Sequence, residues 1–477
     1  MKKFFHISLA TLVASSALAL PIDWHGEIQF DTNSIYDFRR IESTVDNSGA
    51  DGSQEISLAN GNQANSSFQS YIFRLRPEII INDSTTVVAE ITTGSSNGGT
   101  FGDSTTKRDG DPRLSSGLYT FDTVRSNNLN LTQAYAIFYA DTATYKVGRQ
   151  TFDWGLGAIY DNGEEQFSRH STIRDGLTAD FKIGNFNIDL YYSKIQATDS
   201  LTKSARIRET GASVLYDNLD REFAFGILYS SNSASNFAQL QSDQTGSIVG
   251  KTDVKITDIY LRKSWGNFKT EVEFPLINGE VGDVFTAGVN AKIKSKAVLV
   301  HNTYKLNEKH TFKFNGGMVS GDDGIESSFN ALYLHPNYQI ANLLFRYNLN
   351  AISDSSQNVW DSYVTNTTFF KLSHEYSGAG WSWTNSVIYA IANETAKAGE
   401  SAFNHNNGKR FTANFDQEDD LGIEIDSNFS YDWNTSVNFG LNVGYLLTGE
   451  YFGYNNTATP NSAKDSYVLQ AFANIKF

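Results

Sequence analysis

Residues 153–175 concentrate acidic and basic side chains in a polar stretch that follows a strand-like run ending at Gln150. The charged members are Asp153, Asp161, Glu164, Glu165, Arg169, His170, Arg174 and Asp175. Carboxylates opposed to guanidinium groups create a transverse electric field, which orders water and sorts polar solutes by charge. We predict that these groups, His170 apart, form a constriction inside a water-filled passage. The alternative is a solvated surface loop whose charges serve solubility.

A second charged set is expected on the wall of that passage. Arg74 and Arg76 alternate with apolar residues, so their side chains share one face of a strand with Glu78. Further candidates for the water-facing wall are Asp180, Lys182 and Asp189. The two arginines could face the acids of residues 153–175, or each could pair with a carboxylate within the wall.

The sequence contains no convincing motif for catalysis or for metal binding. The absence of Cys excludes disulfides and thiolate chemistry, and none of the eight His residues lies in a His-Glu-x-x-His pattern. A Gly-x-Ser-x-Gly match at residues 94–98 opens a loop rich in Ser, Asn and Gly instead of a helix. A formal net charge of −15 argues against a nucleic-acid partner. We expect no enzyme, no cofactor and no metal.

The elements that must carry the charged groups are strands. Apolar and polar residues alternate clearly at 24–31, 421–433, 437–447 and 467–477. Successive side chains of a strand point to opposite faces, so each such segment has one mainly apolar and one polar face. A wall with lipid outside and water inside requires that pattern. No apolar run in the chain reaches the roughly 20 residues that a membrane-spanning helix needs.

Short and long connections alternate along the chain. Tight polar turns are expected at residues 82–84, 141–143, 184–185, 218–220, 266–267, 307–309, 378–380 and 432–434, and long links at 40–67, 95–128, 152–176, 231–252, 393–417 and 448–464. The rhythm predicts an all-β fold, a closed antiparallel transmembrane β-barrel of about eighteen strands, or roughly 16–18. Its short turns would face the periplasm and its long loops the exterior. Residues 284–306 and 321–358 are ambiguous, because neither reads as one ordinary strand.

The N-terminus has the pattern of a secretory signal. Lys2 and Lys3 precede an apolar stretch, and Ala17-Leu18-Ala19 supplies small residues for cleavage. We therefore expect a signal peptide over residues 1–19 and a single barrel domain over residues 20–477.

The C-terminal strand resembles the assembly signal of Gram-negative outer-membrane β-barrels. Its apolar positions, at every second residue up to a terminal aromatic, are Leu469, Ala471, Ala473, Ile475 and Phe477. The resemblance covers the whole mature chain. It implies an outer-membrane location in a Gram-negative bacterium, with lipid, lipopolysaccharide and the outer-membrane assembly machinery as partners.

Within that class, the run Tyr145-Lys146-Val147-Gly148-Arg149-Gln150, followed by Asp153-Trp154-Gly155, resembles porins and alginate-export-like channels. The 321–324 and 335–338 stretches also resemble that group. Alginate-export channels line the pore with basic residues, whereas this chain is acidic. The resemblance implies a passive channel for small hydrophilic solutes or ions, as a monomer or homotrimer. Two alternatives stay open: a substrate-specific or polysaccharide channel, and a blocked barrel that displays residues 40–67 and 95–128 for adhesion.

Overall fold

The structure is a computed structural model, and it describes residues 21–42, 56, 64–93, 98–101, 105–106, 123–124, 129–166, 168–197, 206–234, 252–282, 289–352 and 358–477. The expected signal peptide (1–19) lies outside the described residues. So do most of the links at 40–67 and 95–128, and all but one residue of the 94–98 match.

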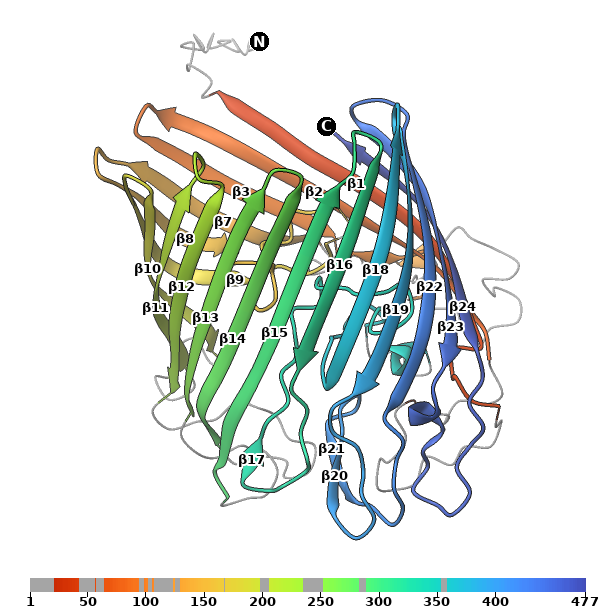
Figure 1. The fold of residues 1–477 in the computed structure, drawn as a ribbon. Coiled ribbons are helices and arrows are strands. Elements are labelled where there is room, and N and C mark those ends of the chain that lie inside the picture. The colour runs from red at the N-terminus through yellow and green to blue at the C-terminus, as the bar shows by residue number, and fades with distance from the viewer. Residues whose placement is uncertain are drawn as a thin grey trace, which may run out of the picture.

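Eighteen strands form one closed antiparallel β-barrel (Figure 1). In chain order they are β1 (Ile22–Tyr36), β2 (Ser66–Asn82), β3 (Thr85–Thr93), β7 (Leu129–Tyr139), β8 (Ala143–Thr151), β9 (Ile173–Ile183), β10 (Phe186–Ala197), β11 (Arg206–Asn218), β12 (Phe223–Ala234), β13 (Thr252–Trp265), β14 (Phe268–Gly282), β15 (Ala291–Lys305), β16 (His310–Val319), β18 (Thr367–Gly378), β19 (Trp381–Ala392), β22 (Asp420–Asp432), β23 (Val437–Thr448) and β24 (Ser466–Lys476). The pairing of β1 with β24, from Glu27 opposite Lys476 to Tyr36 opposite Tyr467, closes the ring. The predicted fold class is confirmed.

Shorter elements lie within the long links. They are β4 (Gly99–Thr100), β5 (Thr105–Thr106), β6 (Thr123–Val124), β17 (Ser328–Phe329), β20 (Ser401–Asn404), β21 (Lys409–Thr412) and the 3-10 turns η2 (Leu349–Ile352) and η3 (Glu450–Gly453). No helix among the described residues is long and apolar enough to cross a membrane.

All eight predicted tight turns join neighbouring strands, and they gather at one end of the barrel together with the start of β1 and the end of β24 (Figure 1). Two of them, 184–185 and 266–267, are two-residue turns that begin with glycine. Gly184 and Gly266 have φ values of 59° and 60°, a left-handed conformation that matches the twist of a tight hairpin and that glycine adopts without strain. We call this end the short-turn end and the opposite end the long-link end.

Strand alternation separates an apolar outer face from a polar inner one. In β24, Tyr467 and Leu469 are exposed on the outside, whereas Val468 and Gln470 are buried on the inside. In β23 the exposed residues Phe439, Leu441 and Val443 follow the same rule. Large apolar side chains thus cover the outside, as a wall against lipid requires.

The two ambiguous segments of the sequence have separate explanations. Residues 291–305 form the single strand β15, which follows a link. Residues 320–366 connect β16 to β18. After β17, which pairs with β15, the described residues 332–349 and 360–364 fold inside the barrel and pack against the inner face of the wall.

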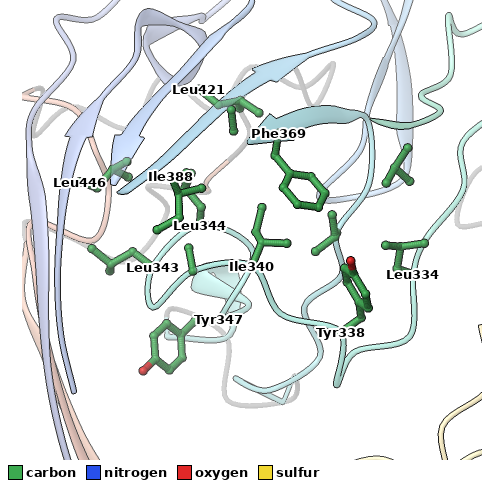
Figure 2. Close-up of a cluster of buried hydrophobic side chains, with 14 of the residues drawn as sticks. Leu334, Tyr338, Ile340, Leu343, Leu344, Tyr347, Phe369, Ile388, Leu421 and Leu446 are labelled. Atoms are coloured by element: carbon green, nitrogen blue, oxygen red, sulfur yellow. The ribbon is translucent and has the colours of Figure 1, made fainter. Parts of the chain in front are cut away.

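Figure 2 shows this interior packing. Ile340, Leu343 and Leu344 of the inward segment lie beside wall side chains of β18, β19, β22 and β23, namely Phe369, Ile388, Leu421 and Leu446. All of these side chains are almost completely buried. The barrel therefore holds a hydrophobic core in part of its lumen, and this core fixes where the segment lies.

Candidate functional site

The charged segment singled out in the sequence forms a loop that crosses the lumen. This 152–172 loop leaves the barrel wall at β8 and returns at β9. On one side, the backbone N–H of Leu156 donates to the carboxylate of Glu273 in β14. On the other side, Arg74 of β2 donates to the carbonyl oxygens of Gly163 (2.8 Å) and Ser168 (3.2 Å). Since β14 and β2 lie on different sides of the ring, the loop spans the passage.

Arg169 anchors the far part of this loop to the wall. Its guanidinium donates to the carboxylate of Asp31 in β1 and to the Ser70 hydroxyl in β2, the latter at 3.0 Å. It also lies over the ring of Trp360, 3.9 Å from the centroid. Burial lowers the pKa of Arg169 to about 10, so the group stays a cation at neutral pH, and its role is anchorage.

The second inward segment, the 320–366 loop, is held by charged side chains of the wall. Glu424 in β22 accepts hydrogen bonds from the backbone N–H groups of Leu343 (2.6 Å) and Leu344 (2.8 Å). The Lys371 ammonium in β18 donates to the carbonyl oxygen of Ile340 at 2.7 Å. These wall groups satisfy backbone atoms that would otherwise be buried without partners.

The two loops meet at Asn337. Its side-chain amide donates to the Asp161 carboxylate (2.6 Å) and to the His170 carbonyl oxygen (2.8 Å). Its side-chain oxygen accepts from the backbone N–H groups of Arg169 (3.1 Å) and His170 (3.2 Å). A contact of 2.9 Å between His170 Nε2 and the Asp361 carboxylate adds a second link. The passage is therefore narrowed by two loops that support one another.

A cavity of about 420 Å³ remains between these loops and the wall. The 152–172 loop contributes Asp153, Asp161 and Glu165, and the wall contributes Glu271 and Lys371. Partial burial and the neighbouring carboxylates of Asp161, Glu165 and Glu164 raise the pKa of Asp153 to about 6. Carboxylates thus outnumber cations around this space, which favours cations over anions.

The arginines of β2 face the acidic loop from the opposite wall. Arg76 donates to Glu164 of the loop (2.7 Å) and to Glu90 of β3 (2.8 Å), whereas Arg74 pairs with Glu27 of β1 (2.9 Å). Arg76 therefore pairs both with an acid of the loop and with a carboxylate of the wall, whereas Arg74 pairs with a carboxylate of the wall. A second cavity, about 220 Å³, lies against Arg74, Arg76 and Glu164.

The remaining constriction candidates lie outside the crossing loop. Arg174 belongs to β9, where it pairs with Glu209 (2.8 Å) between the rings of Phe152 and Tyr191, 3.4 and 3.6 Å from the centroids. Asp175 follows it on the outer face and pairs with Arg149 of β8 at 2.7 Å. These two residues therefore stiffen the wall beside the loop and do not border the cavity.

The wall candidates of β9 and β10 lie on the inner face. Asp180 pairs with Lys146 of β8 at 2.9 Å, and Asp189 accepts a hydrogen bond from Ser213 at 2.8 Å. Lys182 is exposed near the short turn, and Glu78 lies on the inner face of β2. Among the described residues, no three His, Asp or Glu side chains converge as metal ligands.

The sequence interpretation missed the 320–366 loop as part of the site. Asn337, Tyr338 and Lys371 were not among its candidates, although all three border the main cavity. A signal was present in the wall: Phe369, Ile388 and Leu446 are apolar residues at positions that alternation assigns to the lumen. An apolar inner wall in a water-filled barrel indicates that something covers it.

The similarity of this chain to known proteins is a similarity of fold. No family model and no curated protein matches this chain. Solved structures do: OccK5 (OpdH) of Pseudomonas aeruginosa is 12% identical, over 95% of this chain and 98% of that chain, with a TM-score of 0.50. The outer membrane protein OpdK of the same organism is 13% identical, over 95% and 99%, with a TM-score of 0.50. OpdL of P. aeruginosa is 10% identical, over 96% and 98%, with a TM-score of 0.51.

Proposed function

We propose that this protein is an outer-membrane porin through which small hydrophilic solutes or ions diffuse passively. One observation supports this most: two loops cross an eighteen-stranded barrel and leave between them and the wall a cavity of about 420 Å³ lined by polar groups. A structural plug would fill that space with side chains, whereas a channel needs it hydrated. The fold shared with an outer membrane protein of P. aeruginosa supports the location.

The residues proposed for the constriction are Asp153, Asp161, Glu164 and Glu165, opposed by Arg74 and Arg76. The carboxylates border the passage, and the arginines hold the loop and set the positive side of the field. Such a lining is unsuited to a long polyanion, so we favour small solutes over an alginate-like substrate. No cofactor and no catalytic step are part of the proposal.

Assembly and processing complete the proposal. We infer that residues 1–19 are a cleaved signal peptide, and that residues 20–477 form one barrel domain. The apolar face of β24, ending in Phe477, would be recognised by the assembly machinery, and the apolar outer wall would contact lipid and lipopolysaccharide.

Recording from the purified protein in planar bilayers tests the function. Stable ohmic current steps are expected, with a reversal potential on the cation-selective side in a salt gradient. A protein that shifts its gel migration on boiling, as a folded barrel does, but gives no current would contradict the porin and support the blocked, surface-interaction barrel.

A further inference from the structure

A separate cavity of about 380 Å³ lies at the long-link end. Its walls come from residues near the end of β1 and from the 320–366, 393–419 and 449–465 links, and its floor includes Leu344 and Leu421 of the interior hydrophobic core. It is distinct from the acidic cavity, with which it shares no lining residue.

Aromatic rings are prominent in this cavity. Tyr333 and Tyr363 meet edge to face, with ring centroids 5.9 Å apart and planes at 88°. Tyr451 and Phe452 meet in the same way, at 5.5 Å and 86°. Phe452 is covered by Arg40 and Tyr333 stacks on Phe329, whereas Tyr363 is 38% exposed. The exposed ring of Tyr363 is therefore available to a ligand, and an aromatic face packs well against the C–H groups of a sugar ring.

The charged groups of the cavity already have partners. The Arg40 guanidinium lies over the Phe452 ring at 4.4 Å and donates to the Leu343 carbonyl oxygen at 3.1 Å. The Asp361 carboxylate contacts His170. His405 accepts from the Asp322 backbone N–H at 2.8 Å, and burial lowers its pKa to about 3, which leaves it neutral. A charged ligand would therefore have to compete with these internal contacts for Arg40 and Asp361, and it would lose its own hydration on binding.

Thr365 places a buried hydroxyl in the wall of this cavity. Thr365 lines the cavity and is 6% exposed, yet its Oγ1 has no hydrogen-bond partner among the described residues. A buried hydroxyl without a partner is costly, and rotation of the Thr365 side chain toward the cavity would let a ligand hydroxyl satisfy it. An exposed aromatic face, paired charges and an unsatisfied hydroxyl together suit a neutral ligand that carries many hydroxyl groups.

We propose that this cavity binds a neutral sugar at the mouth of the barrel. The ring of the sugar packs against Tyr363, and one of its hydroxyls bonds to Thr365. This inference rests on the proposed function, because the site would collect solute above the constriction. It names neutral carbohydrate as a solute class.

Calorimetric titration of the purified full chain in detergent with maltose tests the site without any current measurement. Maltobionate, the acid obtained by oxidising maltose, serves as the charged probe. We expect maltose to bind and maltobionate to bind at least tenfold more weakly. Tyr363→Ala should weaken maltose binding roughly tenfold through the loss of ring contact. Tyr139→Ala, an exposed tyrosine at the short-turn end, is the matched control and should change nothing.

Thr365→Val separates a ligand-binding role from a structural one. The substitution keeps the side-chain shape and removes the unpaired hydroxyl, so it should weaken maltose binding several-fold while leaving thermal stability equal or higher. A loss of stability with unchanged maltose affinity would assign the hydroxyl to the fold and overturn its part in the site.

The outcomes also distinguish this inference from the porin. A protein that conducts but binds no maltose, or binds maltobionate as well or better, overturns the neutral-sugar site and leaves the channel intact. A protein that binds maltose in the predicted manner but never conducts supports the site and contradicts the channel.

Discussion

At the scale of single residues, the charge of the lumen depends on a few side chains of the 152–172 loop. Glu164 and Glu165 are both exposed, and Glu164 partly neutralises Arg76. A unit charge about 4 Å from a permeating ion contributes about 1 kcal/mol in water, or roughly a fivefold change in relative occupancy. The double substitution Glu164→Ala, Glu165→Ala removes two negative charges and leaves Arg76 less compensated.

We expect this double variant to reduce the cation-to-anion permeability ratio about fivefold, measured as a reversal potential in a salt gradient, with a smaller effect at high salt. Glu418→Ala, Asp419→Ala is the control, because it removes two exposed acids from the 393–419 link. A double variant with unchanged selectivity, or a control with the same shift, would contradict the constriction.

Asp153 gives the lumen a pH dependence. Its raised pKa of about 6 means that the carboxyl is largely neutral at about pH 5 and charged at about pH 7. Cation selectivity should therefore rise over this interval, and Asp153→Asn should flatten the rise. Because the native state binds more protons between the ordinary carboxyl pKa and about 6, the contribution of Asp153 to stability falls as pH rises through that window. A variant that keeps the full pH step would assign the titration to another group.

At the scale of elements, the 320–366 loop is held by side chains that the barrel does not need for its own closure. Leu344 is almost fully buried in the interior core, and Glu424 binds its backbone N–H. Leu344→Ala should destabilise the docked loop by about 2–5 kcal/mol, the usual range for a buried leucine. The strand pairing around it is unaffected, so local release is expected in place of global unfolding.

Hydrogen exchange over residues 331–349 should therefore accelerate in Leu344→Ala, and the current should become larger or noisier, while migration on unboiled gels stays that of a folded barrel. Leu441→Ala, which truncates an exposed leucine of the outer wall, should leave exchange in the loop unchanged. Loss of the heat-dependent gel shift in Leu344→Ala would show that the loop supports the barrel itself.

The strands and turns were predictable because each strand meets two different environments. Where the inner face meets water, as in β23 near Asn442, alternation is plain. Where the 320–366 loop covers the wall, residues such as Ile388 face inward, and the contrast between the faces disappears. The alternation of apolar and polar residues could not predict the position of the 320–366 loop, because tertiary contacts such as those of Asn337 fix that position. Charge singled out the segment that crosses the lumen, but Arg174 and Asp175 were included in it because the start of β9 at Ile173 was not recognised.

At the scale of the whole molecule, the sheet closes into a barrel through one pairing, that of β1 with β24, which we call the seam. β1 and β24 are the first and last strands of the barrel, so their pairing is the last strand pairing that synthesis makes possible. The seam is supported at the long-link end by the stacked rings of Tyr36 and Tyr467, 4.4 Å apart. At the short-turn end, Phe477 and Gly26 exchange backbone hydrogen bonds of 2.8 and 3.0 Å.

Phe477 can therefore serve closure, recognition by the assembly machinery, or both, and these roles make different predictions. Deletion of Phe477 removes one terminal pair of hydrogen bonds from a long ladder, so the barrel refolded in detergent should lose little stability, about 1–3 kcal/mol. If the residue is also read during assembly, the amount of folded barrel in the outer membrane of cells should fall far more than this small loss explains. Deletion that lowers refolding in detergent and yield in cells to the same degree would assign Phe477 to closure alone. Phe439→Ala, at an exposed aromatic of the neighbouring strand β23, controls for the loss of an aromatic from the outer wall.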